Sequence, residues 1–193
     1  MERRYYDIHT HLPRPEVCSP RAVGIHPWDA VADAPLPDLS TAEIIGETGL
    51  DALCRAPLDV QEQLFRRHLA EAERLHKPVV LHVVRSFERV MNILRDYRIE
   101  GVVFHGFIGS VQQAARCYER GYYLSFGARS LRSSRTREVI ALCPSERLFV
   151  ESDDLREPTI ETLCDTVAEL RGCNVESLLQ SIEQNYNRLI YRR

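Results

Sequence analysis

The sequence has no uninterrupted run of about 20 apolar residues, the length that a helix needs to cross a bilayer. Its opening residues, MERRYYDIHTHL, also lack the apolar stretch of a signal peptide. These two absences predict a soluble, cytoplasmic protein that has no membrane partner. No two cysteines have Cys-x-x-Cys spacing, and the six cysteines are widely scattered. We therefore expect reduced and mostly buried thiols.

An excess of positive charge is missing as well. The net charge of −3 at pH 7 provides no global field that would attract nucleic acid, so an anionic substrate must be bound by a local patch. We find no internal repeat, low-complexity tract or linker. With 193 residues, 44% of them hydrophobic, the chain is expected to form one domain over residues 1–193.

Short runs of β-branched and aromatic residues alternate with segments of helical period, which is typical of βα units around a parallel sheet. The runs predict strands near residues 4–8, 21–25, 43–47, 78–82, 101–105, 121–126 and 147–151. Helices are expected from Asp59 as N-cap, near 86–98, over 111–120 behind a Ser110/Gln113 capping box, near 134–142 and 159–171, and along the final stretch from Val175. The pattern predicts an α/β protein.

Several apolar runs end in a residue that can bind a metal ion. In YYDIHTH the residues Asp7, His9 and His11 are spaced by two, so an extended chain points them to one side. The later runs end in Glu47, His82, His105 and Asp153. In a closed parallel barrel these strand ends converge on the face where active sites are built.

Imidazoles and carboxylates together suit Zn, Mn, Fe or Ni, and carboxylates with water also suit Mg. One or two divalent cations are therefore expected, without a choice of metal. A bound cation lowers the pKa of water from about 15.7 toward 7 and polarises the scissile group. Metal-assisted hydrolysis is the chemistry that this residue set predicts.

At these residues the sequence resembles the TatD family of metal-dependent deoxyribonucleases, within the amidohydrolase-like barrel enzymes. The blocks that carry the resemblance span almost the whole chain: DIHTHL (7–12), GIHPW (24–28), IGETGLD (45–51), KPVVLH (77–82), HGFIGS (105–110), YYLSFG (122–127) and VESDD (150–154). Any one block alone would be weak evidence, but their order and content are specific in combination.

The resemblance implies a TIM-like (β/α) barrel and two metal sites. One site would be formed by His9, His11, Glu47 and Asp153, and the other by Glu47, His82 and His105, with Glu47 shared. Asp153 and Glu47 would be the catalytic residues, and Asp153 would orient or deprotonate the attacking water. The implied activity is phosphodiester hydrolysis, typically magnesium-dependent and exonucleolytic on DNA ends.

The chain departs from the family pattern after the first strand. Only residues 13–23 separate HL from GIHP, although a strand, a helix and their connections need roughly 25 residues. We therefore expect seven strands, with one βα unit missing. The open edge would need a cover, either residues 13–20 or a partner subunit. The oligomeric state stays open.

Candidate substrate contacts are His26, Arg85, Arg129 and Arg132. His26 either faces the substrate or closes a turn, and Arg85 lies one position away from its place in the family. The segment ARSLRSSRTR follows a strand, so its arginines either bind phosphate or start a solvated helix. Trp28 is either an exposed stacking surface or part of the core.

The other polar residues receive simpler interpretations. Asp7 is expected to orient a ligand rather than to bind metal. Asp51 and Asp154 are interpreted as polar loop residues, and His68 and His76 as ordinary members of a helix.

Three functions are compatible with this pattern. The leading one is a metal-dependent hydrolase of phosphodiester bonds, a deoxyribonuclease with DNA as its substrate. The second keeps the metal and changes the substrate to a small-molecule ester, amide or phosphate, since a fold does not fix a substrate. The third is a non-catalytic barrel relative, against which the complete ligand set argues.

Overall fold

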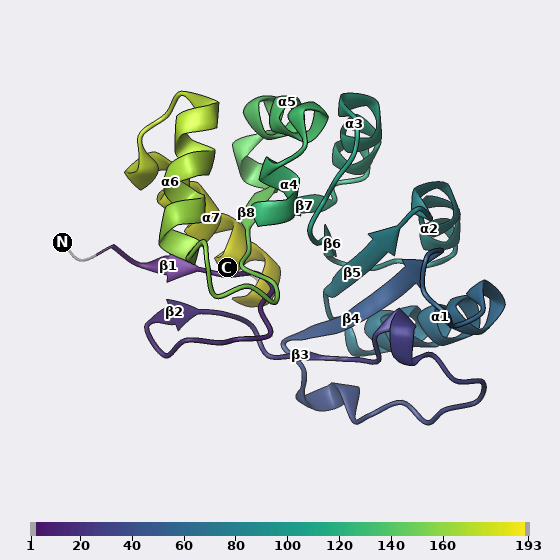
Figure 1. Cartoon of the computed structure of the whole chain (residues 1–193). Helices are drawn as coiled ribbons and strands as arrows, with labels where there is room; N and C mark the ends of the chain where they lie inside the picture. Colours follow the sequence, from purple (N-terminus) through teal and green to yellow (C-terminus); the bar gives the residue numbers. More distant parts are fainter. Residues whose placement is uncertain (1–2, 192–193) are drawn as a thin grey trace. The chain divides into compact units, whose positions relative to one another are not determined.

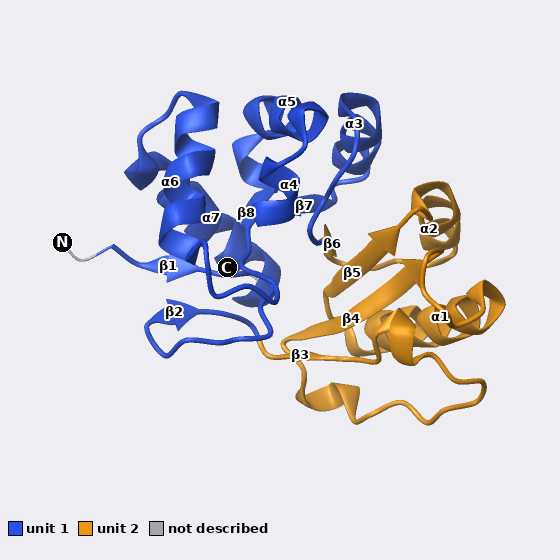
Figure 2. Cartoon of the chain, in the orientation of Figure 1, with its two compact units in different colours: residues 1–20, 105–193 blue, residues 21–104 orange. Residues whose placement is uncertain are grey.

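The structure is a computed structural model that describes residues 3–191. The chain forms two compact units, shown in different colours in Figure 2. Unit 1 contains the chain up to residue 20 and from residue 105 onward, and unit 2 contains residues 21–104. The single domain expected over residues 1–193 stays a prediction. Within residues 3–191, no helix is both long and apolar enough to cross a membrane.

Unit 2 is built on four parallel strands that pair in chain order. The strands are β3 (Ala22–Val23), β4 (Ile44–Asp51), β5 (Val79–Val84) and β6 (Val102–Phe104). The helices are α1 (Leu58–Leu75) and α2 (Phe87–Ile93), with 3-10 turns η1 (Pro27–Asp29), η2 (Leu39–Thr41) and η3 (Leu94–Asp96). All residues of β4 are buried, including its polar residues Glu47, Thr48 and Asp51. The first three residues of β5, Val-Val-Leu, are buried as well, as expected for a strand inside a parallel sheet.

Helix α1 packs against β4 (Figure 1), and its apolar face is buried. Leu64, Phe65 and Leu69 on this face are at most 3% exposed. The helix begins earlier than predicted, because Pro57 occupies the N-cap position and Asp59 lies inside the first turn. A proline at this boundary stops the preceding chain from continuing the helix, and it makes no side-chain cap.

Unit 1 contains two parallel strand pairs and the remaining helices. The strands are β1 (Tyr5–Tyr6) with β2 (Val17–Cys18), and β7 (Tyr123–Phe126) with β8 (Leu148–Val150). The helical elements are α3 (Val111–Glu119), α4 (Ala128–Leu131), α5 (Ser134–Leu142), η4 (Ser145–Arg147), α6 (Ile160–Arg171), α7 (Val175–Tyr186) and the π-helical turn η5 (Asn187–Tyr191). Helices α6 and α7 contact β1 and β8 (Figure 1). The capping box predicted at Ser110 is present.

All seven predicted strands are found, and β2 is an addition. Strand β2 pairs with β1 through Tyr5↔Val17 and Tyr6↔Cys18, and the described chain has no helix between β2 and β3. The segment 13–20 therefore covers the edge of β1, which is one of the two covers expected. Of the βα unit expected to be missing, the described chain has only the strand β2. Its two residues are too few to show a period in the sequence.

Candidate metal centre

Unit 1 gathers four candidate ligands: His9 and His11 follow β1, Asp153 follows β8, and His105 directly follows Phe104, the last residue of β6. One donor atom each of His9, His105 and Asp153 lie within 4.8 Å of one another. The Nε2 atoms of His9 and His11 are each 3.7 Å from Oδ1 of Asp153, and the His9 and His105 rings lie 4.4 Å apart. Four of the six predicted ligands thus form one cluster in unit 1.

The backbone holds this cluster together, because the chain after β1 continues beside the chain after β8. The amide of Asp153 donates to the carbonyl of His9 at 3.1 Å, and the amide of His11 donates to the carbonyl of Asp153 at 2.8 Å. Asp153 has φ +58°, a left-handed conformation that is uncommon for residues other than glycine. Such a conformation persists where surrounding contacts enforce it, and it is common at functional sites.

Asp7 connects the segment after β1 to the segment after β8 through hydrogen bonds. Its carboxylate accepts hydrogen bonds from the amides of His9 and Ser152 at 3.3 and 3.2 Å and from the Ser152 hydroxyl at 2.6 Å. Asp7 is 3% exposed, and burial raises the pKa of its carboxyl to about 7 although these hydrogen bonds act in the opposite direction. Asp7 is thereby placed to orient the cluster.

Glu151 is a buried partner of His105 that the sequence analysis did not single out. Its Oε1 lies 3.3 Å from Nδ1 of His105, and its other oxygen accepts the hydroxyl of Ser125. Burial acts to raise the pKa of Glu151, but the two imidazoles of His105 and His9 and the Ser125 hydroxyl outweigh it and lower the pKa. A carboxylate that accepts the Nδ1 proton fixes the tautomer of a ligating histidine and leaves Nε2 available to a metal.

Unit 2 holds a second cluster, in which Glu47 lies within β4, His82 lies within β5 and His26 follows β3. Oε1 of Glu47 lies 2.6 Å from Nδ1 of His82 and 3.1 Å from Nε2 of His26. Donor atoms of these three residues lie within 4.8 Å of one another. The remaining two predicted ligands, Glu47 and His82, are therefore together as well.

The role of His26 follows from its hydrogen bonds. Its Nδ1 accepts the amide proton of Trp28 at 3.1 Å, which caps η1, so the proton of a neutral ring is on Nε2. That proton points at Oε1 of Glu47, so in this tautomer His26 donates a hydrogen bond to a candidate ligand. His26 both closes its turn and faces the cluster, so the two interpretations of the sequence are compatible; its contact with substrate stays a prediction.

Asp51 pairs with His82 as Glu151 pairs with His105. Asp51 was expected to be a polar loop residue, but it is the last residue of β4 and only 4% exposed. Its Oδ2 lies 3.2 Å from Nε2 of His82. The same oxygen accepts the indole N–H of Trp28 at 2.6 Å. With its proton on Nε2 and shared with Asp51, His82 would direct the lone pair of Nδ1 toward a metal ion held beside Glu47. Trp28 itself is 63% exposed and not part of the core.

The candidate arginines behave differently from one another. Arg129 donates to Oδ2 of Asp153 at 2.7 Å and to Asp154 at 3.0 Å, so it reaches the unit 1 cluster. Arg132 is exposed at the end of α4, and Arg85 is exposed with φ +53° at the end of β5. The structure thus places Arg129 beside a predicted ligand, and the roles of Arg85 and Arg132 in binding substrate stay predictions.

These donor sets fit a divalent cation. Each cluster combines imidazole nitrogen with carboxylate oxygen, which suits Zn, Mn, Fe or Ni. Carboxylate partners such as those of His82 and His105 are typical of ligating histidines. A parallel α/β fold with such groups at the carboxyl ends of its strands is typical of metal-dependent hydrolases.

The chain belongs to the family of TatD related DNases, whose model matches residues 14–191. It is 30% identical to the uncharacterized metal-dependent hydrolase YabD of Bacillus subtilis, over 87% of this chain and 76% of that protein. It is also 30% identical to the 3'-5' ssDNA/RNA exonuclease TatD of Shigella flexneri, but it spans only 55% of that relative. The deoxyribonuclease Tat-D of Schizosaccharomyces pombe is 37% identical over 56% of this chain and 36% of its own length.

Two solved structures confirm the TIM-like α/β fold. The crystal structure of YJJV, a TatD homologue from Escherichia coli, matches with a TM-score of 0.85 at 24% identity over 99% of both chains. A TatD family hydrolase from Entamoeba histolytica matches with a TM-score of 0.80 at 16% identity, over 92% of this chain and 76% of that one. At these identities the likeness concerns the fold alone.

Proposed function

We propose that this protein hydrolyses phosphodiester bonds with the help of bound divalent cations and acts on the ends of DNA. The observation that carries the proposal is the cluster of His9, His105 and Asp153, whose donor atoms lie within 4.8 Å of one another next to the guanidinium of Arg129. A carboxylate and imidazole centre suits a divalent cation, and an adjacent arginine suits a phosphate oxygen.

The proposed ligands are His9, His11, His105 and Asp153 in unit 1 and Glu47 and His82 in unit 2. When bound, a divalent cation would make water more acidic and polarise the phosphoryl group. Glu47 as a ligand shared by two cations stays a prediction, and so does the number of cations. Glu151 and Asp51 would keep the rings of His105 and His82 in one tautomer through the contacts at their outer nitrogens.

Asp153 is the residue that we propose to orient the attacking water and to accept its proton. Its side chain is 20% exposed, so it is open to a solvent molecule while its backbone is fixed by His9 and His11. Arg129 forms an ion pair with this carboxylate at 2.7 Å and is itself half exposed. Arg129 can therefore exchange one carboxylate contact for a phosphate oxygen of the substrate, for which its planar fork of donors is well suited.

DNA as the substrate is supported by relatives that bear the names deoxyribonuclease and ssDNA/RNA exonuclease. The net charge of −3 means that recognition has to be local, and Arg129 and Arg132 in and after α4 supply local positive charge. Hydrolysis of a small-molecule ester, amide or phosphate is the second candidate, because a cavity in unit 1 adjoins His11.

The test is the release of nucleotides from end-labelled single-stranded DNA in Mg²⁺ or Mn²⁺, by wild type and by Glu47→Gln. The variant keeps the size of the side chain and removes its charge, so we expect at least a 100-fold loss of rate. Glu119→Gln makes the same change on the exposed end of α3 and serves as the matched control. Equal rates in Glu47→Gln and wild type would refute the proposal, and turnover of small esters without turnover of DNA would favour the second candidate.

A further inference from the structure

Unit 1 contains a cavity of about 680 Å³ whose lining includes Asp7, His11 and Ser152. Asp7 accepts the amide proton of His9, and Nε2 of His11 lies 3.7 Å from Oδ1 of Asp153, so the cavity adjoins the unit 1 cluster. The walls of the cavity come from residues 7–19, which run from the end of β1 past β2, and from residues 152–160, which run from the end of β8 into the first turn of α6. His11 and Ser152 belong both to this wall and to the surroundings of Asp153. A volume of this order is that of ordinary small-ligand pockets.

The cavity lies beside the segment that leads from β1 to β3 without a helix. Residues 13–20 pass over this region as a loop and a two-residue strand, and no helix of the described chain follows them before β3. Arg14 of the loop forms a two-pronged ion pair with Glu161 of α6, with N–O distances of 3.0 and 2.9 Å, and a further bond of 2.6 Å to Glu16. This bridge joins two walls of the cavity, and it neutralises the charge of Arg14.

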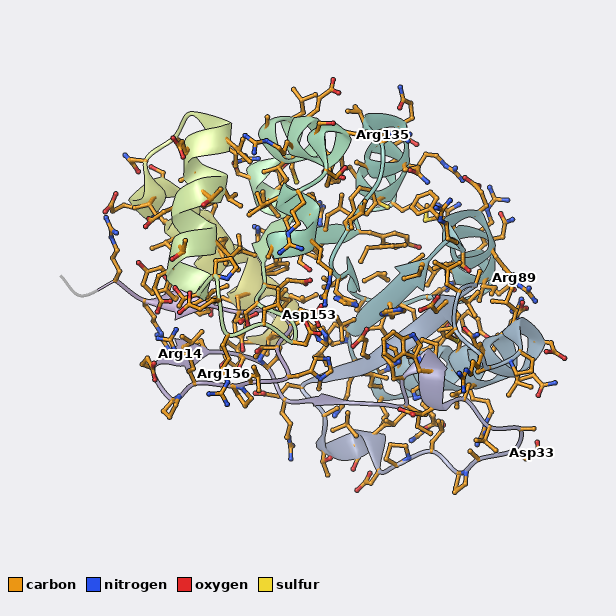
Figure 3. All side chains as sticks on the ribbon, in the orientation of Figure 1. Arg14, Asp33, Arg89, Arg135, Asp153 and Arg156 are labelled. Carbon is orange, nitrogen blue, oxygen red and sulfur yellow. The ribbon has the colours of Figure 1, made fainter. Side chains whose placement is uncertain are left out.

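The cavity is lined by aliphatic side chains and by one arginine, Arg156, that forms no ion pair within the described residues. Leu12, Val17, Leu155 and Ile160 supply aliphatic surface, and hydroxyl groups are supplied by Ser19 and Thr159 among others. Arg156 is exposed at the cavity and has no hydrogen bond or ion pair within the described residues, in contrast to Arg14. Figure 3 shows Arg14 and Arg156 on the same side of unit 1.

A flat, mostly apolar ring system with polar edges and a phosphate group fits this combination. Aliphatic side chains cover the faces of such a ring, hydroxyls bind its edges, and a guanidinium binds phosphate oxygens. We propose that the cavity binds one nucleotide unit of the substrate, with its phosphate on Arg156, next to the bond that is cut. This inference rests on the proposed function, because it places one nucleotide of the DNA substrate next to Asp153, the residue proposed to orient the attacking water.

The test measures the binding of deoxyadenosine 5'-monophosphate to the full chain by calorimetry, with Mn²⁺ and separately with chelator. We expect Arg156→Gln to weaken this binding about tenfold and to leave the binding of deoxyadenosine unchanged, because only the phosphate contact is removed. Ser19→Phe fills the cavity and is expected to weaken both ligands. Arg120→Gln removes an exposed arginine at the end of α3 and serves as the control.

The inference is overturned if wild type and Arg156→Gln bind the nucleotide equally, if Ser19→Phe has no effect, or if inorganic phosphate alone binds as tightly as the nucleotide. A parallel DNA hydrolysis assay separates the two proposals. Binding that depends on Arg156 without DNA hydrolysis would leave the nucleotide site standing and refute the proposed function. DNA hydrolysis by a protein whose nucleotide binding does not depend on Arg156 would support the proposed function and refute the nucleotide site.

Discussion

Replacement of His68 is the perturbation whose consequences follow most completely from the structure. His68 is 0% exposed in α1, its Nδ1 lies 2.8 Å from the carbonyl oxygen of Leu64, and its Nε2 accepts the amide of Ile25 at 3.0 Å. The ring is therefore neutral, with its proton on Nδ1. His68 thereby connects Ile25, the residue before His26, to helix α1. The sequence had suggested no such structural role for His68.

The cost of His68→Ala has two parts. An amide of Ile25 left without its acceptor costs about 1–3 kcal/mol, and the lost packing with the resulting cavity adds about 2 kcal/mol. We expect a loss of about 3–5 kcal/mol in the free energy of unfolding at pH 8, measured by urea denaturation with circular dichroism. His68→Gln can present a carbonyl oxygen to the same amide and should lose less.

The same residue predicts a pH dependence with a definite sign. Burial lowers the pKa of His68, and this exceeds the opposing effect of the Leu64 carbonyl. Below about pH 6.5 the unfolded chain takes up a proton that the folded chain refuses, so wild type loses up to about 1.4 kcal/mol per pH unit until the folded pKa is reached. His68→Gln lacks this contribution, and the stability difference between the two proteins should shrink as the pH falls from 8 to 5.5. A difference that is constant with pH, or that grows on acidification, would refute the argument.

Three further changes test the packing, and urea denaturation measures each. Gly24→Ala would place a Cβ 2.8 Å from the Cα of Gly46, so β3 and β4 must separate and we expect a loss of about 1–3 kcal/mol; an unchanged midpoint would contradict this close approach. Arg14→Ala removes a partly exposed pair with Glu161 and should cost only about 0–1 kcal/mol, whereas a larger loss would show that the bridge is structural. Ser110→Ala removes the cap of α3 and should cost about 1 kcal/mol, and no loss would mean that the cap is dispensable.

Periodicity and residue type predicted the elements that are long or capped. Seven strands and the capping box of α3 are found as expected, because buried strands and amphipathic helices leave a repeated pattern in the sequence. Strand β2 and helix α4 were missed, since two and four residues are too few to show a period. The start of α1 was misplaced because Asp59 resembles an N-cap, while the proline before the helix fixes the boundary.

The candidate ligands could be predicted because strand ends converge, but their supporting partners could not. Asp51 and Glu151 look like other acidic residues until the fold brings them to His82 and His105. His68 shows the same limit, because its importance depends on a backbone amide 43 positions earlier in the chain. The apolar pattern also does not disclose the cavity, because its lining residues come from two stretches that are far apart in the chain, 7–19 and 152–160.

The most direct test of this account is the amount of Mn²⁺ or Zn²⁺ that the purified chain binds, measured by mass spectrometry of the metal after equilibrium dialysis. We predict at least one cation per chain for wild type and for His76→Ala, which alters an exposed histidine paired with Glu100. His9→Ala and Asp153→Asn should each bind clearly less metal because both remove a member of the unit 1 cluster. Metal content equal to that of wild type in both of these variants would contradict the assignment of the centre.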